Sequence, residues 1–375
     1  MDSVEWGEFR IGDLFEIQNT FSFNKNKLTV GSEYDYVTRT SQNQGILQTT
    51  GFVNQNNINQ AGCWSLGLLQ MDFFYRKKSW YAGQFVRKII PKIELEKSSI
   101  LFFTVLLNKQ KKDLLSGLVR DVDKTFLNAK IQLPIKDGEI NFSFMEEFIA
   151  ELEAERIAEL EAYLTVTNLK DYTLTSEEQK ALDDFEQHNW KSFKISKIFE
   201  KLNLKNHNKS FDKLRDTSTI QTAEFNLPLV NAKLGNNGIM FYGREKDFDA
   251  AEMTIDVISN GAVATGTVYA QPQNTGVLWD AYLLQPLSQQ MSKQKLLYMA
   301  TSLQKAIKTK FGWEDKAVWS KVQHETLSLP TKNNQPDYDT METLISAIQK
   351  LVIKDVVVYA DEKIDATKRV VNEKA

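Results

Sequence analysis

The sequence has little of the chemistry on which disulfide-linked and metal-cluster proteins depend. Its single cysteine, Cys63, excludes an internal disulfide and a thiolate metal cluster, so a small buried side chain is its simplest role. Only 7 prolines and 17 glycines occur in 375 residues, which argues against long disordered segments. No run of about 18 apolar residues is present, and residues 1–15 lack the basic and apolar regions of a signal peptide. We therefore expect a globular cytoplasmic protein with no membrane span.

Residue patterns typical of catalysis are also scarce. The three histidines, His188, His207 and His324, are scattered, and none has a metal ligand three or four positions away. No GxxxxGK[ST] phosphate loop occurs, and residues 226–229 (NLPL) lack the second proline and the aromatic residue of an adenine methyltransferase motif. We therefore expect a non-catalytic chain with no metal or cofactor of its own.

Two carboxylate–lysine clusters leave a metal-dependent nuclease open as an alternative. They are Glu94, Glu96 and Lys97 in one segment, and Asp121, Asp123 and Lys124 in another. Such short patterns arise often by chance in a chain that is 25% charged, and surface charge is the simpler interpretation.

The net charge of −3 is distributed unevenly along the chain. Residues 142–187 carry 3 Lys and Arg against 13 Asp and Glu. Residues 1–141 carry 18 against 15, and residues 188–375 carry 25 against 21. Both flanking regions are mildly basic, so the acidic total does not exclude nucleic-acid binding.

An internal repeat is the strongest signal in the sequence. Residues 6–16 (WGEFRIGDLFE) align without a gap with residues 190–200 (WKSFKISKIFE), and three later blocks keep the same order. These blocks are Val37–Ile46 with Val230–Ile239, Gln132–Pro134 with Ser328–Pro330, and Phe142–Ile149 with Tyr338–Ile345. Chance similarity rarely preserves the order of four ungapped blocks, so the sequence predicts a duplicated unit.

Each copy has the same predicted plan, which belongs to the α+β class. A short strand opens the copy, and a region of period-two stretches and Asn-Gly turn signals follows. A short helix comes next, over 100–115 in copy one and 293–308 in copy two, and a Leu-Pro dipeptide then precedes a long helix. The predicted organisation is a globular domain, 1–141; a helix, 142–164; a linker, 165–187; a second globular domain, 188–336; and a helix with a C-terminal tail, 337–375.

The two long helices carry apolar stripes with spacings of three and four residues. The stripe positions that we expect to pair are Phe148, Ile149 and Leu152 in the first helix, and Met341, Ile345, Ile348 and Val352 in the second. A helix of about 35 residues would reach roughly 50 Å. We expect the helices to pair as an antiparallel coiled coil that holds the two globular domains apart. The alternative is that each helix packs on its own domain.

A duplicated unit of this kind resembles the specificity subunits of type I restriction-modification systems and of related type II enzymes with bipartite sites. The resemblance covers nearly the whole chain. It depends on the W-x-x-F-x-I-x-x-[LI]-F-E opening, the Asn-rich turns before Gly45 and Gly238, the segment Asp256–Tyr269 (DVISNGAVATGTVY), the Leu-Pro dipeptides, and the acidic helix starts at 137–139 and 335–337. Copy one departs from the pattern, because Ile58–Leu68 (INQAGCWSLGL) parallels the segment ISNGAVATGTV only loosely.

The resemblance implies that each copy is a target-recognition domain for one half of a bipartite double-stranded DNA site. It also implies that the paired helices set the distance between the halves and dock two methyltransferase subunits, with restriction subunits joining in enzymes that cleave. S-adenosylmethionine, ATP and Mg²⁺ would then belong to the partner chains.

Amide and cationic side chains read base edges and hold phosphates, and they define the candidate contacts. In copy one these are Arg39, Thr40, Gln42, Asn43, Gln44, Arg76, Lys77 and Lys78. In copy two they are Asn231, Lys233, Asn236, Asn237, Arg244, Lys246 and Asn260. For any single asparagine in a turn, capping of the backbone stays open as an alternative role. A binding module for carbohydrate or protein is the competing interpretation of the whole chain.

Overall fold

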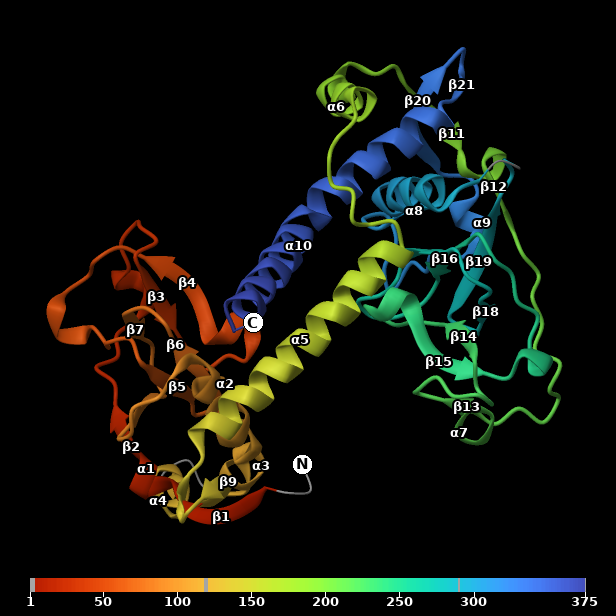
Figure 1. Cartoon of the computed structure of the whole chain (residues 1–375). Helices are drawn as coiled ribbons and strands as arrows, with labels where there is room; N and C mark the ends of the chain where they lie inside the picture. Colours follow the sequence, from red (N-terminus) through yellow and green to blue (C-terminus); the bar gives the residue numbers. More distant parts are fainter. Residues whose placement is uncertain (1–3, 118–120, 289–290, 375) are drawn as a thin grey trace. The chain divides into compact units, whose positions relative to one another are not determined.

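The chain forms two compact units in the computed structural model. The structure describes residues 4–117, 121–288 and 291–374, with side chains up to residue 366 in the last helix. The units are Met1–Leu160 and Glu161–Ala375, and their boundary lies inside the long helix α5 (Phe142–Val166). Each unit combines short sheets with helices (Figure 1), which confirms the predicted pair of α+β units.

Unit 1 is organised around three small sheets. The first joins β1 (Glu5–Arg10), β9 (Lys130–Lys136) and β10 (Glu139–Ile140). The second has the order β2 (Phe15–Asn19), β8 (Val86–Pro91), β5 (Cys63–Gly67), β6 (Asp72–Arg76). The third places β3 (Tyr34–Val37) between antiparallel β4 (Ile46–Thr50) and parallel β7 (Trp80–Ala82). The helical elements are α1 (Ile11–Leu14), η1 (Lys25–Lys27), η2 (Gln42–Gly45), η3 (Gln55–Asn57), α2 (Lys97–Lys109), α3 (Lys111–Ser116) and α4 (Val122–Asn128).

Unit 2 repeats this arrangement of sheets. Its first sheet joins β11 (Trp190–Lys194), β20 (Thr326–Lys332) and β21 (Gln335–Pro336). Its second has the order β12 (Phe199–Lys201), β19 (Ala281–Pro286), β16 (Thr254–Ile258), β17 (Val268–Gln271). Its third contains β13 (Thr217–Ser218), β15 (Ile239–Gly243), β14 (Leu227–Val230) and the parallel β18 (Gly276–Val277). The helical elements are α6 (Ser176–Asp183), η5 (Phe185–Gln187), η6 (Ile195–Lys197), α7 (Lys213–Asp216), η7 (Asn236–Gly238), η8 (Glu245–Asp247), α8 (Lys293–Ile307), α9 (Trp319–Val322) and α10 (Tyr338–Lys374).

The predicted duplication is confirmed by equivalent hydrogen bonds as well as by strand order. The backbone N–H of Phe73 donates to the Asn108 side chain at 3.0 Å, and that of Val268 donates to Gln304 at 2.9 Å. Both bonds tie the short helix of a unit, α2 or α8, to the edge strand of its second sheet. In each unit the amide side chain of the helix accepts a hydrogen bond from a strand N–H next to the core, where an unpaired donor would destabilise the fold.

The Leu-Pro dipeptides place the long helices in the same way in both units. The carbonyl oxygen of Pro134 accepts from the N–H of Asn141 at 2.8 Å, and Pro330 accepts from Asp337 at 2.8 Å. Asn141 and Asp337 then cap their helices, because each side chain accepts from the N–H three residues later, at 3.0 and 3.1 Å. The sequence blocks that revealed the repeat therefore mark the start of α5 and α10.

The strand registers correct one detail of the repeat. The sequence comparison set Ile58–Leu68 against 258–268, but β5 (Cys63–Gly67) is the equivalent of β16 (Thr254–Ile258). Residues 259–267 instead form the connection from β16 to β17, which in unit 1 is only the short turn 68–71. The loose match arose because unit 2 carries a longer connection at this point.

The predicted pairing residues of the long helices fall into two groups. Met341 and Ile345 are buried in the core of unit 2, and Phe148 stacks on Phe144 and meets Phe102 edge-on within unit 1. Ile149 is also buried. The first turns of each helix therefore pack on their own unit, which was the alternative to pairing. Farther along, Leu152, Ile348 and Val352 are 37%, 45% and 74% exposed, so coiled-coil pairing stays a prediction for these later positions.

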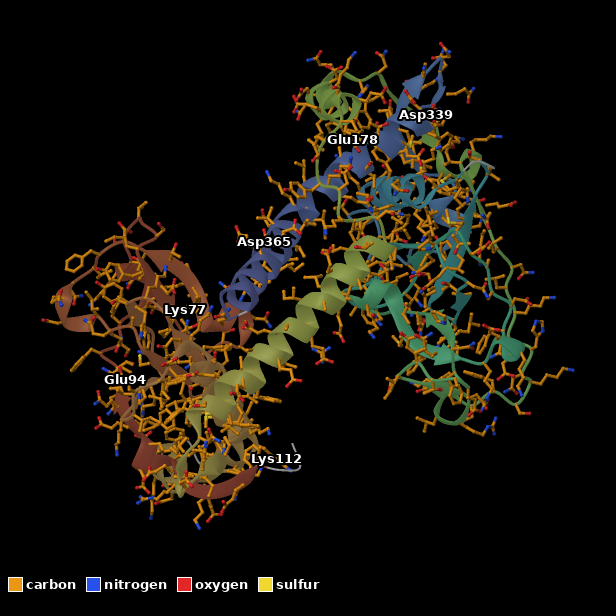
Figure 2. The ribbon with its side chains drawn as sticks, in the orientation of Figure 1. Lys77, Glu94, Lys112, Glu178, Asp339 and Asp365 are labelled. Carbon is orange, nitrogen blue, oxygen red and sulfur yellow. The ribbon has the colours of Figure 1, made fainter. Side chains whose placement is uncertain are left out.

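The expected linker, 165–187, contains the helix α6, which packs on α10 within unit 2. Glu178 of α6 accepts hydrogen bonds from Ser346 at 2.6 Å and from Lys350 at 2.9 Å (Figure 2). Burial opposes ionisation of this carboxyl, but the hydrogen bonds from Ser346, the Thr175 N–H and Lys350 outweigh it and lower its pKa to about 2. Among the described residues, no helix has both the length and the apolar character needed to cross a membrane.

Candidate recognition turns

Each unit presents one polar turn with an unusual backbone. The turns connect β3 to β4 and β14 to β15. The second turn has a positive φ already at Gly235, and both turns share three further successive residues with positive φ. These are Asn43, Gln44 and Gly45 in unit 1, and Asn236, Asn237 and Gly238 in unit 2. Asparagine and glycine tolerate this left-handed backbone better than other residues, which explains why the block stands out in the repeat.

The first asparagine of each turn has a structural role. The side-chain amide of Asn43 donates to the carbonyl of Ile46 at 3.2 Å, and that of Asn236 donates to Ile239 at 3.1 Å. Both bonds close the turn onto the strand that follows. The capping alternative is therefore the observed one for Asn43 and Asn236.

The second residue of each turn is held from below by a buried side chain. Arg76, at the end of β6, donates to the carbonyl oxygen of Gln44 and to the Ser65 hydroxyl. In unit 2 the equivalent strand position is Gln271, which donates to the carbonyl oxygen of Asn237 at 2.7 Å. Arg76 is only 2% exposed, and burial lowers its pKa to about 10. The prediction that groups Arg76 with surface contacts therefore needs correction: Arg76 supports the turn from inside the unit.

The side chains that remain at the surface of the first turn border an open cavity of about 630 Å³. Arg39, Thr40, Ser41 and Gln42 line it from the turn, and Gln70 and Gln84 line it from other connections. The Arg39 guanidinium lies over the Phe85 ring, 5.2 Å from its centre, in the geometry of a cation–π contact. The cavity thus gathers amide, hydroxyl and guanidinium groups on one face.

The two lysines after β6 differ in their surroundings. Lys78 pairs with Asp35 at 2.9 Å and also donates to the carbonyl of Ser32. Lys77 is exposed (Figure 2). Of this pair, Lys77 is the better candidate for a phosphate contact.

In unit 2 two of the candidates, Asn231 and Asn260, contact Asp280. Asn231 is 5% exposed, and its side-chain oxygen accepts from the Asp280 N–H at 2.9 Å. Asn260 donates to the Asp280 carboxylate at 3.0 Å. Asn231 therefore holds the turn to a neighbouring connection. Lys233 is half-buried beside it, and Lys246 is exposed in η8.

The guanidinium of Arg244 forms ion pairs with three carboxylates of its own unit. It contacts Glu224 at 2.8 Å, Asp216 at 3.0 Å and Asp247 at 3.4 Å. These hydrogen bonds, that of Glu224 foremost, raise the pKa of Arg244 above its usual value. A guanidinium shared among three anions is less available to a phosphate, so Arg244 organises the surface of unit 2, and its contact with DNA stays a prediction.

A buried acid beneath the second turn was not expected from the sequence. Asp256, on β16, is fully buried, and its carboxyl oxygens have no hydrogen-bond partner in the described part of the chain. Burial raises its pKa well above the usual range, because a charged carboxylate is poorly solvated in the core. A Cβ on Gly238 would lie 2.5 Å from this carboxyl, so the turn rests directly on it.

The carboxylate–lysine clusters do not assemble into a metal site. Asp123 pairs with Arg87 at 3.1 Å. Within residues 4–117, 121–288 and 291–374, no group of three or more His, Cys, Asp or Glu side chains lies close enough to hold an ion. Cys63 is buried, in agreement with its expected role.

Two copies of one scaffold, each presenting a rigid polar turn of the same shape, define a duplicated recognition protein. The chain belongs to the family described as the type I restriction modification DNA specificity domain, whose model matches it twice, over residues 3–162 and 187–357. It is 22% identical over 355 residues to S.BcgI, the specificity subunit of a type II restriction enzyme of Heyndrickxia coagulans, covering 93% of this chain and 96% of that protein.

One solved structure supports the same fold. The S subunit of a type I restriction-modification system from M. genitalium matches all of this chain and 96% of its own length, with a TM-score of 0.56 and 13% identity. The HsdS subunit from Thermoanaerobacter tengcongensis covers 97% of this chain and 94% of its own, with a TM-score of 0.30 and 15% identity.

Proposed function

We propose that each unit reads one half of a bipartite double-stranded DNA site, and that the chain confers sequence specificity on methyltransferase subunits. The observation that carries this proposal is the pair of equivalent turns. The three left-handed residues of the turns and the hydrogen bonds that support them match, whereas the side chains on the turns differ. A common frame with different groups is what two readers of two unlike half-sites require.

The differences lie in the first half of each turn. The N–H groups of Thr38 and Asn231 bond to the carbonyls of the two turn glycines, Gly45 and Gly238, and these bonds align the turns. In this alignment Arg39 corresponds to Ala232, Thr40 to Lys233, and Gln42 to Gly235. Arginine and glutamine pair with guanine and adenine edges in the major groove, and lysine holds guanine or phosphate. Unit 1 therefore has the richer set of base-reading groups on its turn, and unit 2 relies more on other connections.

The partners follow from this function. Two methyltransferase subunits would supply S-adenosylmethionine chemistry, and restriction subunits would supply ATP- and Mg²⁺-dependent cleavage in an enzyme that cuts. The exposed positions Leu152, Ile348 and Val352 support a role of the long helices in pairing and in setting the distance between the two half-sites. Catalysis is assigned to the partner chains.

The experiment is to co-express the chain with the methyltransferase encoded beside it and to map adenine methylation across the host genome. We expect one bipartite motif with a fixed gap. Substitution within Arg39–Gln42 should change one half of the motif, and substitution of Lys233 and Leu234 should change only the other. A stable complex that adds no new methylation would rule out the specificity function, and retention of carbohydrate or protein but not of duplex DNA would favour another ligand.

A further inference from the structure

A second connection approaches the turn in both units, and no repeat signal marks it in the sequence. It links β7 to β8 in unit 1 (residues 83–85) and β18 to β19 in unit 2 (residues 278–280). Gly83 donates its N–H to the carbonyl of Val37 at 2.8 Å, and Leu278 donates to Val230 at 3.0 Å. The residue that begins each connection is thus bonded to the last residue of the strand before the turn.

The last residue of the connection also makes equivalent hydrogen bonds in the two units. The carbonyl of Phe85 accepts from Leu68 at 2.9 Å, and the carbonyl of Asp280 accepts from Ser259 at 2.9 Å. These bonds fix the alignment without a gap, at a constant difference of 195 residues. Gln84 and Trp279 are therefore structural equivalents, held between two bonded neighbours.

Both equivalent side chains are exposed. Gln84 lines the same cavity as Arg39, Thr40 and Gln42. Trp279 is 63% exposed, and it directly precedes Asp280, which Asn231 and Asn260 contact. The rings of Trp279 and Phe211 meet in a T-shaped arrangement, with their centres 6.1 Å apart. An exposed tryptophan fixed in this way presents a large apolar surface that the fold of unit 2 leaves uncovered.

We infer that Gln84 and Trp279 are specificity-determining residues, each reading one base pair in the half-site of its own unit. This inference rests on the proposed function. The carboxamide of Gln84 matches the N6 and N7 atoms of adenine, and the indole of Trp279 matches the C5 methyl group of thymine. The shared frame and the unlike side chains explain how a duplicated unit comes to prefer two different sequences.

The test uses the complex of the whole chain with its methyltransferase, and the readout is the methylation motif of each variant. Gln84→Glu should change one base pair of one half-site from adenine to cytosine, because a carboxylate accepts from the cytosine amino group. Trp279→Gln, which carries the residue of unit 1 into unit 2, should change one base pair of the other half-site from thymine to adenine. Each change should alter the preference at its base pair by about tenfold to a hundredfold.

Matched controls lie on the sheets β1–β9–β10 and β11–β20–β21, which occupy the ends of the units away from β3 and β14 (Figure 1). Gln132→Glu and Trp190→Gln change the same residue types there and should leave the motif unchanged. An unaltered motif for Gln84→Glu, or loss of the methyltransferase from the Trp279→Gln complex, would overturn the inference. If the wild-type complex itself gives no bipartite motif, the proposed function has failed instead.

Discussion

The buried side chain of Gln271 donates a hydrogen bond of 2.7 Å to the backbone carbonyl oxygen of Asn237. Arg76 makes the equivalent bond to Gln44 in the first unit. Two different residue types, at one position of the fold, thus hold the same point of the same turn. Because a left-handed turn is strained unless its surroundings hold it, these bonds explain how both turns keep one shape.

Removal of the support should destabilise one unit and leave the other unchanged. Arg76→Met deletes the bonds to Gln44 and Ser65 and keeps most of the side-chain volume, so we expect a loss of about 2–3 kcal/mol from the free energy of unfolding of unit 1. Hydrogen exchange, followed separately in the two units, measures this. Lys77→Met is the control and should have little effect, and equal loss in both units would contradict the argument.

The buried carboxyl of Asp256 should make the free energy of unfolding of unit 2 depend on pH. The folded pKa of this carboxyl is raised and the unfolded value is about 3.9, so folding takes up a proton above pH 4. Stability should fall with rising pH by about 1.4 kcal/mol per unit while the folded carboxyl keeps its proton. Asp256→Asn should remove this dependence and stabilise unit 2 at pH 7, as measured by urea unfolding between pH 4 and 7.

The control for that experiment is Asp339→Asn, because the side chain of Asp339 is exposed at the start of α10 (Figure 2). It should leave the pH dependence as it is in the wild type. A pH profile of Asp256→Asn identical to that of the wild type would show that Asp256 is ionised in the folded chain.

The docking of α6 on α10 should depend on the charge of Glu178. Its folded pKa of about 2 lies below the unfolded value of about 4.3, so its stabilising contribution is present above pH 4.3 and is lost as the pH falls towards 2. Glu178→Gln leaves Lys350 without a buried anion and should cost about 1–3 kcal/mol at pH 7. Limited proteolysis within 165–187 measures the release of α6.

A matched control for this contact is Glu177→Gln, an exposed neighbour on the same helix. We expect it to be cleaved at the wild-type rate. If both variants are equally sensitive to protease, helix propensity rather than the Lys350 contact decides the docking.

The two glycines of the second turn separate backbone strain from steric contact. Gly235 and Gly238 both have a φ of 76°, but a Cβ on Gly235 meets nothing within 4 Å, whereas one on Gly238 meets Asp256 at 2.5 Å. Gly235→Ala should cost about 1–2 kcal/mol from strain alone. Gly238→Ala should cost more, and equal losses in chemical unfolding would show that Asp256 moves aside freely.

Much of the fold was predictable because the repeat and the helix signals are local. The Leu-Pro dipeptides and the apolar spacing that predicted the long helices are read from neighbouring residues, and the structure bears out both helices. The asparagine–glycine pattern likewise indicated where the turns lie, since few other residues accept a left-handed backbone.

The candidate contacts were predicted less well, because polarity alone does not reveal what a side chain touches. Arg76, Asn231 and Arg244 are residue types that often contact DNA. In the structure Arg76 donates to the carbonyl of Gln44, Asn231 accepts from the N–H of Asp280, and Arg244 contacts three carboxylates. Gln84 and Trp279 were missed, since they share no residue type and become equivalent only through strand register.

The amino-acid sequence by itself determined that the chain is a duplicated α+β protein, where its turns and long helices begin, and which family it resembles. These features depend on residue type and short spacing. Only the tertiary structure decided which polar groups are buried supports and which face solvent. It did so because β6 and β17, distant in sequence from the turns, bring Arg76 and Gln271 beneath them, and a hydrogen bond across more than 30 residues leaves no local pattern.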